Sequence, residues 1–255
     1  MRTNLRNRVP GFFETRNSLP SKMDAIDFHS KTSEKFDQYY SQSSPFRERF
    51  QVWSKLIDRY LVKDGSVLDA GCGSGVMSFY AAQKGNPVLA IDGSEEMIEL
   101  CRKKSLSNPH LQLEFRVGKL PFRDMLNDDR FDMIISSSVL EYISEYESCL
   151  DEFSAHLNTG GIAVISLPNR KSLYRKFEKL VYAIFRRPSY YAFVKNLFSL
   201  EEFNRKMKDR GFEIVESQFY ASSPIINNLS SIFSLPESRS RNLFVGVYKK
   251  MTSTN

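Results

Sequence analysis

The stretch VLDAGCGSG, residues 67–75, combines an acid with three glycines at a spacing that suits nucleotide binding. An apolar run carries Asp69 near its end, and the glycines follow as GxGxG from Gly71 to Gly75. A dinucleotide site needs GxGxxG, whose third glycine lets a helix approach the pyrophosphate, but that position holds Val76. A carboxylate two residues before the first glycine suits an ammonium group better than a phosphate. The turn is therefore predicted to bind a zwitterionic nucleotide derivative and not NAD.

A second acid stands at the end of the next apolar run. Asp92 closes PVLAID (87–92), and its two carboxylate oxygens can accept hydrogen bonds from two ribose hydroxyls. Glycines in a strand-to-helix turn are by themselves common turn residues. Here the glycine turn follows a predicted strand, opens a predicted helix and precedes an acid-tipped second strand, and this context favours a binding site.

The elements that must position these residues alternate regularly along the chain. Apolar runs that predict strands lie at 66–70, 87–92, 111–117, 131–138 and 161–167, with helix-like stretches at 75–84, 94–104 and 144–157 between them. Helical patterns precede them at 24–61, and a helix at 199–210 and strands at 211–220 and 242–250 follow them. This alternation predicts right-handed crossovers and an open, doubly wound α/β sheet. Ligands of such sheets bind at the carboxyl ends of the strands.

Five segments together resemble the class I S-adenosylmethionine-dependent methyltransferases. They are VLDAGCGSG (67–75), AIDGSEEMI (90–98), FDMIISSSVLEYI (131–143), LNTGGIAVISLPN (157–169) and FSLEEFNRKMKDRGFEIV (198–215). The resemblance extends from about Phe36 to Tyr248, and its first two motifs are specific. It implies a mostly parallel, seven-stranded Rossmann-like sheet with an antiparallel last strand, a helical N-terminal segment and a helical insertion after strand five.

The resemblance also implies which residues hold S-adenosylmethionine. Gly71 and Gly73 would border the methionine moiety, Asp92 would bind the ribose, and Met97 would pack on the adenine. The full expected cofactor set is Asp69, Gly71, Cys72, Gly73, Asp92, Gly93, Met97, Leu120 and Ser137.

The chain departs from the family pattern at two places. Many members have an acid after strand three that takes the adenine amino group, but here the segment is VGKLPF with Lys119. The loop after strand four lacks the Asn-Pro-Pro-Tyr sequence that holds planar amides, so nucleobase and protein amides are not expected as acceptors.

No catalytic base is assigned from the sequence. An in-line methyl transfer gains most of its rate from alignment, but a hydroxyl acceptor also needs a base, whereas a neutral amine or a carboxylate does not. The candidates are Glu141, Tyr142, Tyr39 and Tyr40; Glu141 is better explained as a helix N-terminal carboxylate. His29 can approach the site only if the N-terminal segment folds over it, and His110 and His156 are expected on the surface.

The segments LEYI and SLPNRKS also resemble the ubiquinone-pathway O-methyltransferases, which carry a Glu-His pair and an upstream acid that can bind a divalent ion. Here those positions read Ser138, Glu141 and Tyr142, so no metal is predicted.

Composition and charge limit the classes of protein to which the chain can belong. The 255 residues are 41% hydrophobic and 26% charged, with no apolar run long enough to span a membrane, and the three cysteines show no paired spacing, which fits a reducing, cytoplasmic compartment. The formal net charge of the chain is +6. Residues 1–22 carry a net charge of +4 and residues 170–195 one of +7, so the remaining residues carry a net charge of −5. A general nucleic-acid surface is therefore not expected.

The predicted organisation is one domain at 24–250, which begins with N-terminal helices at 24–61. We predict a basic, flexible arm at 1–23 before it and a tail at 251–255 after it. The arm has weak similarity to a mitochondrial transit peptide.

A basic, aromatic insertion, residues 169–198, lies between strand five and the last helix, on the expected acceptor side. Its apolar residues follow helical spacing on one face: Leu173, Tyr174, Phe177, Leu180, Val181, Ile184 and Phe185. Residues 171–187 are interpreted as a lid helix over the acceptor, as an interfacial helix that reaches a lipophilic substrate in an anionic membrane, or as an RNA-contacting patch. Each interpretation expects the apolar face to pack against something.

The sequence thus predicts a methyltransferase, with a role in biosynthesis, that acts on an oxygen or nitrogen of a small, aromatic or lipophilic metabolite. One alternative is an RNA or protein methyltransferase that uses the basic segments. Another is a non-catalytic, cofactor-binding subunit. The oligomeric state is not predicted.

Overall fold

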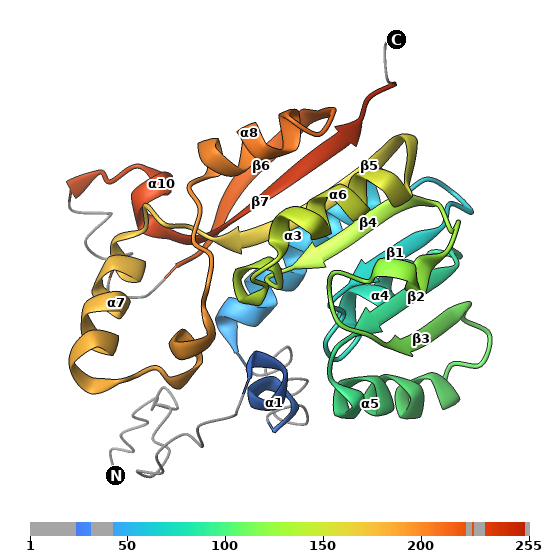
Figure 1. Cartoon of the computed structure of the whole chain (residues 1–255), viewed down its shortest axis with the longest axis horizontal. Helices are drawn as coiled ribbons and strands as arrows, with labels where there is room; N and C mark the ends of the chain where they lie inside the picture. The colour runs from blue at the N-terminus through green and yellow to red at the C-terminus, as the bar shows by residue number, and fades with distance from the viewer. Residues whose placement is uncertain (1–23, 32–42, 223–225, 227–232, 253–255) are drawn as a thin grey trace, which may run out of the picture.

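The computed structural model of the chain describes residues 24–31, 43–222, 226 and 233–252 (Figure 1). The predicted arm at 1–23 and the candidates Tyr39 and Tyr40 lie outside the described residues.

A seven-stranded sheet with the order β3-β2-β1-β4-β5-β7-β6 forms the centre of the molecule (Figure 1). Its strands are β1 (Val67–Ala70), β2 (Val88–Asp92), β3 (Leu113–Val117), β4 (Phe131–Ser137), β5 (Leu157–Pro168), β6 (Phe212–Ser222) and β7 (Arg241–Lys250). The pairs from β3 to β5 are parallel, and β7 runs antiparallel to both β5 and β6. The predicted doubly wound, mostly parallel sheet with an antiparallel last strand is confirmed.

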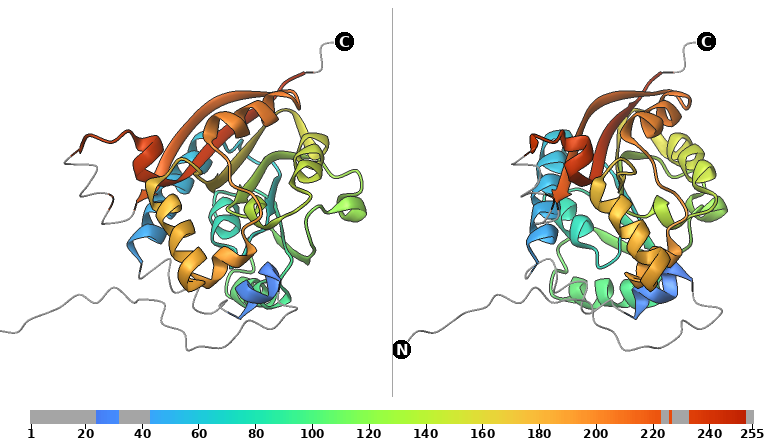
Figure 2. Two further views of the ribbon diagram at one scale, coloured as in Figure 1. Left: turned by 60° about the vertical axis from the view of Figure 1, so that its left-hand side comes forward. Right: turned by 90° about the vertical axis from the view of Figure 1, so that its left-hand side faces the viewer.

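Helices cover both faces of the sheet, as the alternation of strands and helices predicts (Figure 2). They are α1 (Ala25–Ser30), α3 (Ser44–Tyr60), α4 (Val76–Ala82), α5 (Glu95–Leu106), α6 (Tyr146–His156), α7 (Leu173–Phe185), α8 (Leu200–Lys208) and α10 (Glu237–Ser240), with short 3-10 turns η1 (Arg123–Leu126), η2 (Leu140–Tyr142) and η3 (Ser189–Phe193). Buried residues of α3, α4 and α5 pack on one face, and those of α6 and α8 pack on the other. Trp53 of α3 and Phe203 of α8 are fully buried anchors of the two layers.

The insertion after β5 contains the helix that its spacing predicts. This helix is α7, and its Phe177, Leu180, Ile184 and Phe185 are exposed, so these four side chains do not form a lid packed on the described part of the chain. Glu178 is the buried residue of this helix.

Candidate functional site

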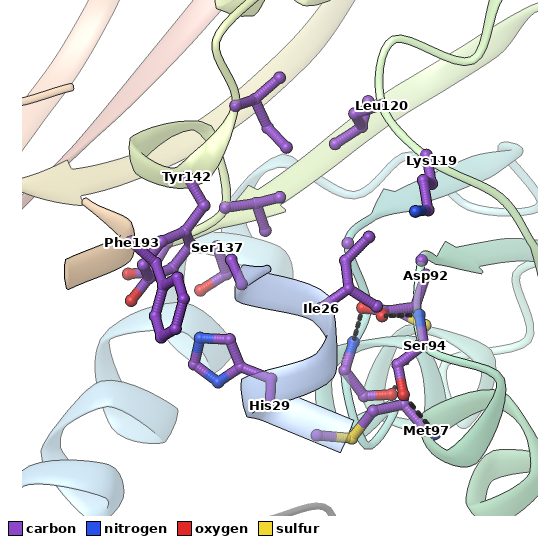
Figure 3. Close-up of a pocket in the computed structure, with 18 of the residues that line it drawn as sticks. Ile26, His29, Asp92, Ser94, Met97, Lys119, Leu120, Ser137, Tyr142 and Phe193 are labelled. Carbon is purple, nitrogen blue, oxygen red and sulfur yellow. Dashed lines mark hydrogen bonds between the residues drawn. The ribbon is translucent and has the colours of Figure 1, made fainter. Parts of the chain in front are cut away.

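A cavity of about 590 Å³ opens at the carboxyl ends of β1, β2 and β4 (Figure 3). The sheet order reverses direction between β1 and β4, and ligands of doubly wound sheets bind at such a switch point. All nine residues predicted to hold the cofactor line this cavity: Asp69, Gly71, Cys72, Gly73, Asp92, Gly93, Met97, Leu120 and Ser137.

The glycine turn after β1 has a backbone conformation that requires glycine, and a hydrogen bond joins it to Asp92. Gly71 has φ +80°, and a Cβ atom there would lie 2.4 Å from Cγ2 of Val139, so the turn needs glycine on both counts. The Gly73 N–H donates a hydrogen bond to Oδ2 of Asp92 at 2.8 Å. Two neighbouring strand ends are thereby fixed to each other around one face of the cavity.

Asp92 keeps hydrogen-bonding capacity beyond this brace. Its Oδ1 accepts a hydrogen bond from the Ser94 N–H at 2.9 Å, so each carboxylate oxygen has one protein donor and a further lone pair. Burial raises the pKa of Asp92, although both backbone donors act in the opposite direction. Met97, from the first turn of α5, lies buried against the same part of the cavity.

Asp69 is only 2% exposed, and it points from β1 toward the same cavity. Its Oδ2 accepts a hydrogen bond from the Ser78 hydroxyl at 2.6 Å. Burial raises the pKa of Asp69 to about 7; the Ser78 hydrogen bond opposes this rise, the charge of Asp92 adds to it, and Arg49 also opposes it. A carboxyl group in this state gains most from a ligand that brings a positive charge.

Helix α1 lies between α5 and η3 and forms one wall of the cavity (Figures 1 and 3). Its Ile26 occupies the space above Gly93, where a Cβ atom would lie 2.5 Å from Cδ1 of Ile26. The Ser30 hydroxyl donates to the Ser94 hydroxyl at 2.7 Å. The N-terminal segment therefore folds over the site, which is the condition under which the sequence allowed His29 to approach it.

The opposite half of the cavity carries an aromatic wall. The ring of His29 lies 5.2 Å from that of Tyr142, and Phe193 lies close to both (Figure 3). The Phe28 ring lies 5.4 Å from that of Phe193. Burial lowers the pKa of His29, and the charge of Arg49 lowers it further. Burial, followed by the charge of Glu141, raises the pKa of Tyr142. At neutral pH this half therefore presents a neutral imidazole and a neutral phenol.

Glu141, a candidate base from the sequence, lies behind this wall and is not among the described residues that line the cavity. Burial raises its pKa to about 7, against its own backbone hydrogen bond and the charges of Arg49 and Arg175. Its backbone carbonyl accepts hydrogen bonds from the N–H groups of Lys195 at 2.7 Å and Asn196 at 3.0 Å. Glu141 thus anchors the segment after η3, which supplies part of the cavity wall.

His110 is exposed and His156 is partly buried, and neither lines the cavity. No cluster of three His, Cys, Asp or Glu side chains that could hold a metal ion occurs within the described part of the chain.

Several lining residues were missed by sequence reasoning, among them Ile26, Arg49 and Phe193. The Arg49 guanidinium donates to both the carbonyl and the hydroxyl oxygen of Ser137, each at 2.6 Å. Arg49 lies four positions before Trp53 on the side of α3 that carries the apolar stripe. A charge within an apolar stripe was the available signal. Lys119, at the departure from the family pattern, lines the cavity and lies 3.7 Å from Oδ2 of Asp24.

Comparisons with known proteins show which family the chain is similar to. The family model described as a methyltransferase domain matches residues 46–217. A malonyl-[acyl-carrier protein] O-methyltransferase of Hamiltonella defensa is 31% identical over 122 residues, which cover 47% of this chain and 45% of the relative. A ubiquinone biosynthesis O-methyltransferase of Xylella fastidiosa is 30% identical over 165 residues, which cover 60% and 65%. The matched part thus amounts to less than two thirds of these curated relatives.

Solved structures show the same fold. Magnesium protoporphyrin IX methyltransferase from Synechocystis PCC 6803, determined with bound S-adenosylhomocysteine, superposes with a TM-score of 0.64 at 17% identity. The superposition covers 89% of this chain and 100% of that one.

Proposed function

The chain belongs to the class I S-adenosylmethionine-dependent methyltransferases, and from this premise we propose which of its residues bind the cofactor and what kind of acceptor it methylates. We assign the cofactor to the half of the cavity between the ends of β1 and β2. Asp69 would take the ammonium group there, and Asp92 would take the ribose hydroxyls. Gly71, Cys72 and Gly73 would follow the methionine moiety, Gly93 and Met97 the adenine, with Leu120 and Ser137 on the remaining walls.

The observation that carries this assignment is the brace between the two strand ends. Asp92 accepts the Gly73 N–H with one oxygen and the Ser94 N–H with the other, so its carboxylate is held in one orientation before any ligand arrives. A preoriented acceptor pair loses little freedom when two vicinal hydroxyls bind to it. Asp69, with its raised pKa, supports a cationic group at the other end of the ligand.

We propose that the acceptor is an oxygen, or a nitrogen, of a small aromatic or lipophilic metabolite. The rings of His29, Tyr142 and Phe193 in the second half of the cavity support an acceptor with apolar surface. The enclosure by α1 and η3 supports a small molecule over a folded RNA or protein. The two curated relatives are named as O-methyltransferases, which favours oxygen over nitrogen.

For a hydroxyl acceptor, the residues present can complete the reaction. When bound, S-adenosylmethionine would supply the methyl group: the acceptor oxygen would bond to the methyl carbon as the carbon–sulfur bond broke, and the sulfur would keep that electron pair. The hydroxyl proton needs a base, and the neutral imidazole of His29 is the group in this wall that can accept it at neutral pH.

Calorimetry with S-adenosylhomocysteine and with NAD tests the cofactor assignment. We expect binding of S-adenosylhomocysteine and none of NAD, because Val76 stands where the dinucleotide turn needs its third glycine. Tighter binding of NAD would overturn the assignment. Native mass spectrometry of the purified chain, extended to small molecules retained beside the cofactor, then addresses the acceptor.

A further inference from the structure

Helix α7 exposes a row of large apolar side chains at the edge of the molecule. Phe177, Leu180, Ile184 and Phe185 are 59%, 59%, 64% and 67% exposed. The first three lie three and four positions apart, on one side of the helix, and Phe185 lies beside them. The helix occupies the left-hand edge of Figure 1 and faces the viewer in the right-hand view of Figure 2. Contiguous exposed apolar surface of this kind marks an interaction site.

A buried polar cluster fixes the direction in which this row points. Glu178, only 3% exposed, pairs with Nη1 of Arg175 at 2.6 Å, and it accepts a hydrogen bond from the Tyr190 hydroxyl. The same Arg175 nitrogen donates to that hydroxyl at 2.8 Å. Turning the apolar row inward would take this ion pair apart and place its charges in new surroundings. The row of four apolar side chains is therefore on the outer side of a helix whose inner side carries this buried ion pair.

Positive charge surrounds the exposed row. Lys176, Lys179, Arg186 and Arg187 are all exposed, and the single acid between residues 173 and 187 is the buried Glu178. A second copy of this chain, packed about a two-fold axis, would set these bases against their equivalents, which costs energy. Binding of RNA would use base stacking on aromatic rings, but Leu180 and Ile184, half of the exposed row, offer no ring for it. An anionic lipid surface matches both the charge and the apolar side chains.

We propose that α7 lies in the headgroup layer of an anionic membrane, with Phe177, Leu180, Ile184 and Phe185 among the acyl chains and the basic side chains at the lipid phosphates. The turn η3 follows α7 closely, and its Ala192 and Phe193 line the acceptor half of the cavity. A lipophilic acceptor dissolved in that membrane would thus reach the cavity from the α7 side. This route rests on the proposed function, whereas the membrane contact itself does not depend on it.

Sedimentation with vesicles tests the contact without knowledge of the acceptor. The wild-type chain is expected to pellet with vesicles of phosphatidylcholine and phosphatidylglycerol at low salt, to be released at high salt, and to stay in solution with phosphatidylcholine alone. The double variant Phe177→Asp with Ile184→Asp should lower the partition coefficient at least about tenfold, since it removes two large apolar groups and adds two negative charges. Val62→Asp with Leu106→Asp is the matched control, because both residues are exposed elsewhere on the surface, and it should pellet like the wild type.

Further variants and measurements keep the outcomes apart. Lys176→Glu with Lys179→Glu should also abolish pelleting, whereas Lys63→Glu with Lys103→Glu, two exposed lysines away from α7, should not. Titration with S-adenosylhomocysteine should give the wild-type dissociation constant for every variant. A wild-type chain that does not bind S-adenosylhomocysteine would contradict the cofactor assignment without affecting the test of the membrane contact. The proposal is overturned if wild type stays in the supernatant, if the α7 variants pellet as well as their controls, or if light scattering shows a dimer that the Phe177→Asp, Ile184→Asp variant splits. Binding to single-stranded RNA that the lysine variant loses and the aspartate variant keeps would equally overturn it.

Discussion

At the scale of single residues, the cavity is organised by Asp69 and Asp92 at the ends of two adjacent strands. The two acids use their protein contacts differently. Asp92 is bonded by two backbone donors, which orient both of its oxygens. Among the described residues, Asp69 is bonded by Ser78 alone and is almost completely buried, and burial outweighs these hydrogen bonds in its raised pKa. Asp92 therefore presents two oriented oxygens to a ligand, whereas Asp69 interacts with the charge of the ligand.

Replacement of Asp92 by Ala is expected to weaken S-adenosylhomocysteine binding by about 2–3 kcal/mol, or about 30- to 160-fold, because two charge-assisted hydrogen bonds to the ribose are lost. Calorimetric titration measures this directly. Glu95→Ala is the matched control, since it removes one exposed acid close by on α5 that does not line the cavity. An unchanged dissociation constant for Asp92→Ala would remove this residue from the site.

The raised pKa of Asp69 predicts a pH dependence of cofactor binding. An acid whose pKa rises to about 7 in the ligand-free protein is protonated below that pH, whereas an ammonium group binds its ionised form. Binding below pH 7 must therefore release a proton, so affinity is lost as the pH falls, by up to about tenfold per pH unit. Titrations at pH values between about 5 and 8 give the slope.

Asp69→Asn provides the control for this dependence, because its side chain can still accept the Ser78 hydrogen bond but does not titrate. The variant should bind weakly and with little change between pH 5 and 7. A slope that persists in the asparagine variant would assign the titration to Glu141 or His29 instead.

At the scale of elements, α7 differs from the other long helices because its one buried side chain, Glu178, is charged and paired with Arg175. Removing Glu178 leaves Arg175 buried without its partner. We therefore expect Glu178→Ala to lower the free energy of unfolding by about 3–5 kcal/mol, whereas Glu201→Ala, which breaks the exposed pair with Lys171, should cost under about 1 kcal/mol. Urea unfolding compares the two variants, and equal effects would show that the buried pair does not hold the helix.

The same helix shows where prediction from sequence ends at this scale. The spacing of Phe177, Leu180 and Ile184 indicated a helix with one apolar side, which the structure has. Which side turns inward depends on Tyr190, a residue beyond the end of the helix that completes the polar cluster. Periodicity within one element carries no information about such a partner.

At the scale of the whole molecule, the sheet and the nucleotide side of the cavity could be predicted because each of their parts is local in sequence. A strand, its turn and the following helix are consecutive, so Asp69, Gly71 and Asp92 can each be recognised from the residues next to them in the sequence. The acceptor side is assembled from α1, α3, η2 and η3, whose residues meet only through tertiary packing. Arg49, Ile26 and Phe193 were therefore not predicted.

Because the cavity joins both sheet halves at the switch point, its occupation should stabilise the fold as a unit. At a ligand concentration of about 100 times the dissociation constant, S-adenosylhomocysteine should add about 2.7 kcal/mol, which raises the melting temperature by about 5–11 °C. Differential scanning calorimetry checks this rise, and at the same ligand concentration the Asp92→Ala variant should show much less of it. A full rise in that variant would place the ligand elsewhere.

Helix α1 contacts both halves of the cavity, through Ile26 above Gly93 and through His29 beside Tyr142. If α1 must move before either ligand can leave, release of the spent cofactor and of the methylated product would depend on the same helix. Acceptors of very different nucleophilicity should then be processed at nearly the same maximal rate, because release and not methyl transfer would set that rate.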